Sequence, residues 1–401
     1  MARCGLYVHI PYCVSKCGYC DFYSVEIAGR DVGPLVEALV TELRGRVRAC
    51  TDRIETVFMG GGTPTTLPLP TFRFIMAAMG EVVQDHRCLE FTVEANPGTV
   101  DSQRLEILVE AGMNRLSLGG QSFLPSELLW LERDHSPEEI APAVALARRY
   151  GIKRINLDLI FGIGGQTMAT WDTSLSRALD LGVDHLACYG LTYEPGTRLD
   201  AMRRRGEVKP CDEGLEADMY LHAIDRLAAA GYEQYEISNF AQPGQRCQHN
   251  LIYWLNEPYI GVGPSAAGYR DGTRYKNISS IREYTDRIGR AGEAVAETER
   301  LDATARAGET IMLQLRMTDG IHIDRFVQHT GVDPRHVLAE PLARMEREGL
   351  VTITADSIRL TRRGLLVADA IIADLMVELD RCDSVPIQST DATAVDVGAM
   401  R

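Results

Sequence analysis

The chain has 401 residues, of which 45% are hydrophobic and 24% charged. This composition excludes wholesale disorder and fibrous structure. At about 150 residues per domain, the length predicts two or three domains. The net charge of -14 makes nucleic acid and anionic membranes unfavourable partners. No window approaches the roughly 18 apolar residues of a membrane span, and the start lacks a secretory pattern. We therefore expect a cytoplasmic protein.

A repeating strand-then-helix rhythm fills roughly residues 5–240. Strands rich in Val, Ile and Leu that alternate with helices predict an α/β fold with a parallel sheet. Six or so such units favour a full or partial TIM-type (β/α) barrel, with an open doubly wound sheet as the alternative. The strands are expected at 5–10, 54–59, 89–95, 115–119, 154–161, 185–191 and, last and shortest, 233–238.

The pattern changes near residue 300, where helices and a short hairpin resemble a winged helix. Residues 305–380 hold nine Arg and no Lys against twelve acidic residues, which disfavours DNA binding and favours a packing or lid domain. We expect helices at 305–315, 323–330, 334–348 and 362–379 and hairpin strands at 350–353 and 357–360. The predicted organisation is a barrel at 1–240, a connecting segment at 241–300, a C-terminal helical, winged-helix-like domain at 301–380 and a disordered tail at 381–401.

Three of the ten cysteines, Cys13, Cys17 and Cys20, are clustered, while the others are scattered and expected to be reduced thiols. Three thiolates within eight residues can converge on one metal site. Structural zinc prefers four protein ligands, whereas a [4Fe–4S] cluster on three cysteines leaves one iron open to a small molecule. The loop follows the first strand at its carboxyl end, where barrel chemistry lies. An iron–sulfur site is therefore favoured over a zinc module.

The spacing Cys-x3-Cys-x2-Cys after a first strand, with Tyr19 just before the third cysteine, resembles the radical S-adenosylmethionine (SAM) superfamily. The resemblance implies a [4Fe–4S] cluster on Cys13, Cys17 and Cys20, with SAM bound at the open iron. In that family an electron from the cluster cleaves SAM to methionine and a 5′-deoxyadenosyl radical. Whether this chain turns SAM over is left open, and no residue is assigned as catalytic.

Polar residues and glycines follow several of the predicted strands. The run from Gly60 to Pro64 follows the second strand, where glycines let backbone N–H groups approach a ligand. Taken singly, the polar residues could equally be satisfied core groups. A closer resemblance, over about residues 5–380, is to the coproporphyrinogen dehydrogenase group. It implies that SAM is contacted by Tyr7, Tyr19, Gly61, Gly62, Thr63, Glu94, Gln121, Arg133 and Asp158.

Two features separate the subfamilies of that group. Phe22 stands where the dehydrogenase has a fourth cysteine, and the first strand is expected at residue 5, whereas the dehydrogenase resemblance would imply a long N-terminal extension before it. In addition, His249-Asn250-x-x-Tyr253-Trp254 resembles the haem-binding signature of HemW-type haem chaperones. Histidine ligates haem iron, and Tyr and Trp stack on porphyrins. From the residues alone, a core histidine beside two buried aromatic residues is the alternative.

The hypothesis is therefore a cytoplasmic radical-SAM haem chaperone. It would carry a [4Fe–4S] cluster and SAM as cofactors and haem as cargo, and deliver haem to haem-requiring respiratory proteins. Any association with the membrane would be peripheral and made through the acceptor. The alternative is an oxygen-independent coproporphyrinogen III oxidase that forms protoporphyrinogen IX, an activity that Phe22 and the haem motif disfavour. The sequence does not reveal the oligomeric state.

Overall fold

The computed structural model describes residues 3–381. They form two compact units. The first holds the residues up to Tyr253 together with Glu257–Glu299, and the second holds Trp254–Asn256 and the residues from Arg300 onward. The predicted tail, 381–401, lies outside the described residues except for Arg381. Among the described helices, none is long and apolar enough to cross a membrane.

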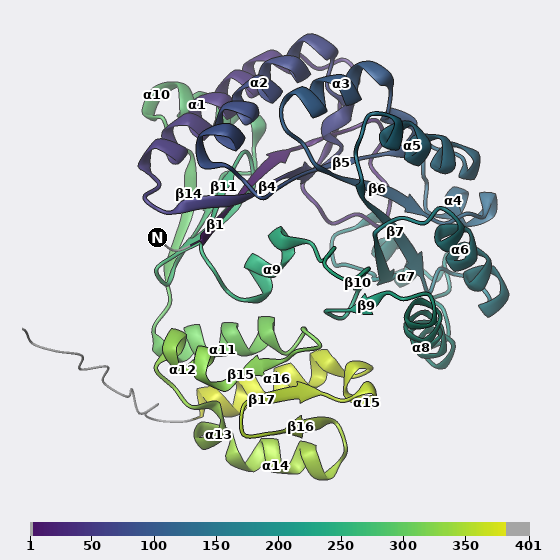
Figure 1. The fold of residues 1–401 in the computed structure, drawn as a ribbon, viewed down its shortest axis with the longest axis vertical. Helices are drawn as coiled ribbons and strands as arrows, with labels where there is room; N and C mark the ends of the chain where they lie inside the picture. Colours follow the sequence, from purple (N-terminus) through teal and green to yellow (C-terminus); the bar gives the residue numbers. More distant parts are fainter. Residues whose placement is uncertain (1–2, 382–401) are drawn as a thin grey trace, which may run out of the picture. The chain divides into compact units, whose positions relative to one another are not determined.

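The first unit is built on a curved sheet whose central strands are parallel (Figure 1). Six of them follow one another in both sequence and space: β1 (Arg3–Ile10), β4 (Arg53–Gly61), β5 (Glu90–Ala95), β6 (Arg115–Gln121), β7 (Arg154–Phe161) and β8 (His185–Gly190). This order confirms the predicted repeated βα units. In the described residues the order begins at β14 and ends at β9 without closing, so the barrel is partial.

Helices cover the outer, convex face of this sheet (Figure 1). They are α1 (Gly33–Ala49), α2 (Leu69–His86), α3 (Ser102–Glu110), α4 (Pro125–Trp130), α5 (Pro137–Arg149), α6 (Met168–Asp180) and α8 (Glu213–Ala229). Helix α2 shows why they pack there, because its Phe72, Ile75, Met76 and Met79 recur at helical spacing and are all buried. Helix α7 (Arg198–Arg204) lies beside the cysteine loop, where the Leu199 amide donates to the Gly18 carbonyl at 2.8 Å. One short helix, α9 (Gln248–Trp254), lies instead on the inner, concave side (Figure 1).

Both edges of the sheet carry further strands, most of them antiparallel. Beyond β1 lie β11 (Tyr259–Val262), which is parallel to β1, then β12 (Ala267–Arg270), β13 (Thr273–Asn277) and β14 (Val295–Arg300), with α10 (Ile281–Ala291) before the last strand. Beyond β8 lie β10 (Asn239–Ala241) and β9 (Glu233–Gln234). The strands within 241–300 had no sequence prediction, because they are short and lack a βα rhythm.

The predicted strand 233–238 is wrong beyond Gln234. The chain reverses there, and β9 and β10 pair antiparallel. The Ile237 carbonyl accepts hydrogen bonds from the Tyr220 hydroxyl and the Gln234 amide, so side chains occupy the backbone group that a strand partner would use. The periodicity of this short segment could not reveal those partners.

Within its described residues, the second unit packs six helices around a small sheet of order β15-β17-β16. Its elements are α11 (Ala303–Gln314), β15 (Ile321–His322), α12 (Ile323–Thr330), α13 (Pro334–Val337), α14 (Ala339–Arg347), β16 (Val351–Ile353), β17 (Ser357–Leu360), α15 (Arg362–Leu365) and α16 (Ala368–Asp380). The predicted helices 334–348 and 362–379 are each interrupted, at Leu338 and at Leu366–Val367. Leu338 has a non-helical backbone and is buried in the core of the unit, so packing overrides local helix propensity.

Short elements connect the barrel strands to their helices. The strands β2 (Tyr12–Cys13) and β3 (Val25–Glu26) form a separate two-stranded ladder after β1. The 3-10 turns η1 (Pro64–Thr66) and η2 (Pro97–Thr99) follow β4 and β5. These elements lie at the carboxyl end of the sheet, beside the cysteine loop.

Candidate cofactor site

The three clustered cysteines lie in one loop that is closed at its base by β2 and β3. Tyr12 pairs with Val25 and Cys13 with Glu26, and the Ile27 amide donates to the Cys13 carbonyl at 2.9 Å. Inside the loop the Cys20 amide donates to the Cys17 carbonyl at 3.2 Å. All three thiols are free and half-buried. The loop thus holds them in a small region that ligands can still reach.

A second set of contacts fastens this loop to the segment after α4. The Gly18 amide donates to Glu132 at 2.9 Å, and Glu132 also forms an ion pair with Arg198. The Arg133 guanidinium donates to the Cys17 thiol at 3.4 Å and to the Gly119 carbonyl at 3.2 Å. Its Nε atom is buried without a hydrogen-bond partner. A cation with spare donor capacity therefore faces the cysteine loop, as an anionic thiolate cluster requires.

Burial favours the protonated form of two of the thiols, Cys13 and Cys20, when no metal is bound. It raises the pKa of Cys20 to about 11 and raises that of Cys13, whose thiol accepts a long contact of 3.9 Å from the Thr63 hydroxyl. Metal binding displaces such protons because only the thiolate ligates well. A cavity of about 440 Å³ opens beside Cys17 and Cys20, lined also by Lys16, Gly18, Asp21 and the segment 195–198.

The glycine run at the end of β4 is shaped by close backbone approach. Gly61 has φ +105°, a left-handed conformation, and a Cβ there would overlap the His9 ring. A Cβ on Gly62 would overlap the Tyr12 backbone, and the Gly62 amide donates to the Ile10 carbonyl at 2.8 Å. The Gly61 amide donates to Glu94 at 3.0 Å. These glycines let β4 lie directly against the start of the cysteine loop.

Two carboxyl groups, Glu94 and Asp158, lie on the inner side of the sheet. Burial, together with the nearby Asp158, raises the pKa of Glu94 to about 7. Burial also raises the pKa of Asp158 to about 6, although a 2.7 Å hydrogen bond from Asn156 lowers it. Carboxylates held this way gain from a bound cation. The arrangement therefore favours a positively charged ligand.

The predicted SAM-binding residues come together at the carboxyl ends of the strands. Tyr7 shares a 3.0 Å hydrogen bond with His9 on the same face of β1. Gln121, the last residue of β6, has φ +62°, an unusual conformation for a residue other than glycine. Tyr19 lies in the cysteine loop and packs against an apolar cluster that includes Leu131 and Leu199. The remaining residues lie at the positions described above: Gly61, Gly62, Thr63, Glu94, Arg133 and Asp158.

Sequence reasoning missed three residues that support this site. His9 could have been found, because the strand period of two places it on the same face as Tyr7. Its Nε2 atom also bonds the Tyr23 carbonyl at 2.8 Å. Glu132 and Asn156 gave no local signal. The partner of Glu132, Gly18, is 114 positions away, and only the folded chain shows that contact.

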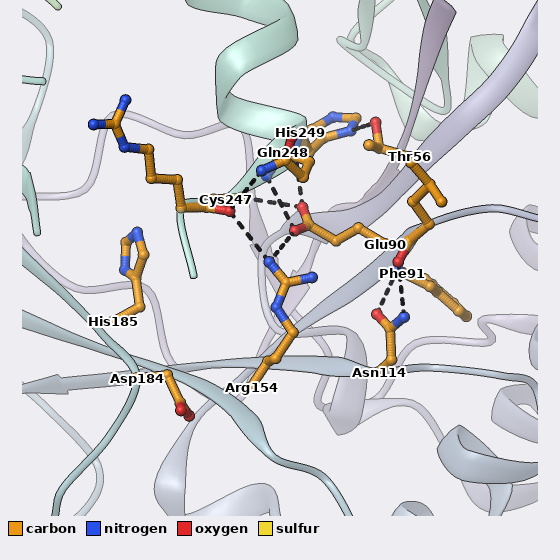
Figure 2. A network of polar contacts seen from close by, with 12 residues as sticks. Thr56, Glu90, Phe91, Asn114, Arg154, Asp184, His185, Cys247, Gln248 and His249 are labelled. Atoms are coloured by element: carbon orange, nitrogen blue, oxygen red, sulfur yellow. Dashed lines mark hydrogen bonds and ion pairs between the residues drawn. The ribbon is translucent and has the colours of Figure 1, made fainter. Parts of the chain in front are cut away.

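The first of the predicted haem residues, His249, lies beside Glu90 at the start of β5 and so at the amino end of the strands; Figure 2 shows its contacts. His249 is fully buried, and both ring nitrogens are bonded, Nδ1 to the Thr56 hydroxyl at 2.8 Å and Nε2 to the Tyr253 hydroxyl at 2.9 Å. Its ring stacks on Phe58 with 5.3 Å between centroids. Burial lowers the pKa of His249 to about 4, so the ring is neutral, as metal ligation needs.

A buried carboxylate, Glu90, holds the start of α9. It accepts the backbone amides of Gln248 and His249, each at 3.0 Å, and pairs with Arg154 at 2.8 Å (Figure 2). Burial alone would raise the pKa of Glu90, but Arg115, Arg154 and the two amides outweigh it and lower the pKa. The sequence gave no hint of this residue, whose partners lie far along the chain.

The four residues of the haem motif do not share one unit. His249, Asn250 and Tyr253 belong to the first unit and Trp254 to the second. Asn250, Tyr253 and Trp254 are half-buried. The Trp254 indole nitrogen is buried without a hydrogen-bond partner, and the Arg316 guanidinium lies 5.9 Å from the centre of its ring.

The partial barrel and the three-cysteine loop define a radical SAM protein. The model of the Radical SAM superfamily matches residues 7–178, and that of the HemN C-terminal domain matches residues 301–367. The fold is also that of coproporphyrinogen III oxidase (HemN) from Escherichia coli. The structures superpose with a TM-score of 0.80 over 94% of this chain and 90% of that one, at 22% sequence identity. At that identity the likeness concerns the fold alone.

Full-length relatives give the particular family. The chain is 34% identical to the haem chaperone HemW of Bacillus subtilis, over 93% of this chain and 99% of that protein. It is 34% identical to HemW of Escherichia coli, over 93% and 98%, and 35% identical to HemW of Mycobacterium tuberculosis, over 93% and 94%. The chain belongs to the HemW family within the radical SAM superfamily.

Membership of this superfamily implies a [4Fe–4S] cluster and SAM as cofactors. The residues present fit both groups. The three thiols lie in one loop, and one of them, Cys17, contacts a buried cation that has an unused donor. Next to them lie the glycines that admit no side chain and the carboxyl groups with raised pKa values, Glu94 and Asp158. Such groups suit a ligand that carries a sulfonium and an ammonium group.

Proposed function

We propose that this protein is a haem chaperone, which binds haem and delivers it to haem-requiring proteins. The observation that carries the proposal is the match to the Bacillus subtilis haem chaperone over 99% of that protein's length. Phe22, at the position of the dehydrogenase's fourth cysteine, supports it. The proposal includes both units, since the relative spans both.

In this proposal Cys13, Cys17 and Cys20 hold the cluster, and Arg133 keeps its positive charge against the Cys17 sulfur. The cluster, when bound, would supply the electron that cleaves the sulfonium of SAM in this superfamily. Glu94 and Asp158 would balance the positive charges of SAM. The glycine run at the end of β4 would leave room for the methionyl end of SAM. Tyr7, Tyr19, Thr63 and Gln121 orient it from the neighbouring strands and loops.

His249 is the proposed haem ligand, with Asn250, Tyr253 and Trp254 beside the porphyrin. Because Thr56 and Tyr253 occupy its two nitrogens, one of these hydrogen bonds must break before iron can bind. The neutral ring loses no proton on ligation. Haem uptake is thus coupled to a movement of α9.

The test is an anaerobic haem titration of the cluster-reconstituted protein, followed by desalting and absorbance. The wild-type chain should retain about one haem per chain, and His249→Ala should lose most of it while keeping its iron–sulfur content. His185→Ala is the matched control. His185 is also buried at the amino end, with both nitrogens bonded, to Asn156 and Tyr235. Full retention by His249→Ala would demote the motif to core packing, and equal losses in both variants would mean misfolding.

We also propose that the acceptors are respiratory haem proteins, that the chaperone works in the cytoplasm and that it meets the membrane only through those acceptors. Haem-loaded protein should restore oxygen uptake in membrane vesicles from haem-starved cells, and His249→Ala should not. Restoration by free haem at the same concentration would argue against delivery. Cell fractionation should place most of the protein in the cytoplasmic fraction.

Coproporphyrinogen decarboxylation is the activity to exclude. Incubated anaerobically with coproporphyrinogen III, SAM and a reductant, the reconstituted protein should form no protoporphyrinogen IX. Product at a rate that Cys17→Ala abolishes would replace the chaperone proposal with the dehydrogenase.

A further inference from the structure

One buried arginine on the inner face of the sheet has donor capacity that the chain does not use. Arg115 is the first residue of β6 and is 3% exposed. The strand period of two places it on the same face as Ser117, whose hydroxyl accepts from the Asn156 amide at 2.9 Å. Asn156 also donates to Asp158, on the inner side. Among the residues that the structure describes, the Arg115 guanidinium forms no hydrogen bond and no ion pair, although buried charges normally do.

Arg115 belongs to the middle of three rows of side chains across this face. Glu90, Thr92 and Glu94 alternate along β5 and so share a face. Glu90 accepts the first amides of α9, and Glu94 accepts the Gly61 amide at the cofactor end. Thr92 lies between them, is the register partner of Arg115 and has a buried hydroxyl without a hydrogen-bond partner. A cation and a hydroxyl with unused donors therefore lie side by side, midway along the strands.

The next arginine in the same row is fully engaged. Arg154 is the register partner of Arg115 on β7, and it pairs with Glu90 at 2.8 Å and donates to the Arg246 carbonyl at 3.2 Å. Glu90 thus already has its arginine. Burial opposes the charge of Arg115, but Glu90 and Asp158 are among the groups that outweigh burial and raise the pKa of Arg115. The more deeply buried of the two arginines is therefore a cation that is free to bind an anion.

We propose that Arg115 and Thr92 bind a carboxylate, and that this carboxylate is a propionate of haem. The proposal rests on the proposed haem function. A guanidinium suits a carboxylate because it donates two parallel hydrogen bonds, and the Thr92 hydroxyl adds another donor. Haem carries two propionates on one edge of the porphyrin. His249, the proposed iron ligand, is bonded through its amide to Glu90 at 3.0 Å, only two residues along β5 from Thr92.

This subsite offsets part of the cost of haem entry. Iron reaches His249 only after a hydrogen bond to Thr56 or Tyr253 has broken. A propionate at Arg115 and Thr92 makes hydrogen bonds that the described chain leaves unmade, so it displaces none. A porphyrin whose propionates are blocked gains no such compensation and should bind more weakly.

The experiment compares haem with haem dimethyl ester, in which neither propionate is charged. Each is titrated anaerobically into the full-length, cluster-reconstituted protein, and dissociation constants are taken from the absorbance change. Wild type should bind haem at least about tenfold more tightly than the ester. Arg115→Met should bind the two about equally, because only haem loses an interaction. If wild type retains haem but binds the ester equally well, the subsite is overturned and the chaperone proposal stands, whereas retention of neither porphyrin would overturn both.

A second variant keeps the test independent of whether Arg115→Met folds. Thr92→Val removes a hydroxyl that has no partner in the described chain, so thermal unfolding of the cofactor-free protein should show no loss of stability. Its preference for haem over the ester should nevertheless fall about fivefold. Thr330→Val is the matched control in the second unit, because that buried hydroxyl donates to the Phe326 carbonyl at 2.8 Å and accepts from the Val332 amide at 3.2 Å. It should lose stability and keep the wild-type preference. An unchanged preference in Thr92→Val and Arg115→Met would overturn the proposal.

Discussion

The two ends of the partial barrel treat their polar groups in opposite ways. At the carboxyl end, Arg133 keeps a buried Nε atom without a partner and Glu94 has a pKa raised to about 7. At the amino end, Glu90 accepts two backbone amides and an arginine, and both nitrogens of His249 are bonded. Unsatisfied buried groups cost stability, so the carboxyl end is arranged for ligands and the amino end is arranged to hold the fold.

This difference matters for the haem proposal. A ligand at the cofactor end gains interactions that the chain leaves open, whereas a ligand on His249 must first displace interactions already made. Haem affinity should therefore depend on how easily α9 moves, and cluster retention should not. Variants at the two ends should accordingly separate the two kinds of binding.

The largest effect is expected at the cysteine loop. Cys17→Ala should abolish the visible absorption of the reconstituted cluster, because two remaining cysteines retain a cubane poorly. Cys211→Ala, which removes another half-buried thiol outside the loop, should keep full absorption and iron. Iron and sulfide analysis after desalting is the measurement. Full iron content in Cys17→Ala would contradict the assignment of Cys17 as a cluster ligand. Zinc without sulfide in the wild-type chain would indicate a zinc module.

Glu90→Ala should have the largest effect on stability. It leaves Arg154 without its ion-pair partner and uncaps α9, which we expect to cost about 3–5 kcal/mol. Thermal unfolding of the wild type, this variant and Glu81→Ala measures it. Glu81 pairs with Arg44 on the surface, so its loss should cost at most about 1 kcal/mol. Similar losses in both variants would show that the buried network contributes little.

Glu94→Gln tests the carboxyl end of the barrel, and its effect on stability should depend on pH. Because the folded-state pKa of Glu94, about 7, lies above its ordinary 4.5, its neutral form favours folding below pH 4.5. That advantage disappears as the pH rises through 7. The glutamine cannot ionise, so the variant should be about 3 kcal/mol more stable than wild type at pH 8 and nearly equal at pH 4.5.

Unfolding midpoints of the cofactor-free proteins at the two pH values measure this difference. Glu110→Gln, at an exposed residue paired with Arg73, is the control and should show no such dependence. SAM binding should weaken in Glu94→Gln even though the chain is more stable. If the stability difference between Glu94→Gln and wild type were the same at both pH values, Glu94 would ionise in the folded chain without a cost in stability.

The sequence predicted most of the barrel because its strands and helices are long and strongly periodic. It failed where long-range contacts decide the structure, as at Ile237, whose carbonyl is bonded by side chains, and at Leu338, which leaves helical geometry to enter a core. Cysteine spacing and the glycine run are local signals, so the cofactor loop could be foreseen. Glu90 could not, because its partners His249 and Arg154 are 159 and 64 positions away.

The smallest effects are expected from two glycine substitutions. One lies at the packed amino end of the barrel, and the other lies in helix α1, where there is room for a side chain. A Cβ at Gly5 would lie 3.1 Å from the His249 ring and 3.2 Å from Ile252, so Gly5→Ala should destabilise the chain by about 1 kcal/mol. Gly45, inside α1, has no atom within 4 Å of such a Cβ. Gly45→Ala should therefore stabilise by about 0.5–1 kcal/mol through helix propensity. Thermal unfolding of both variants gives the signs, and a stabilising Gly5→Ala would mean that α9 yields easily, which would favour haem access to His249.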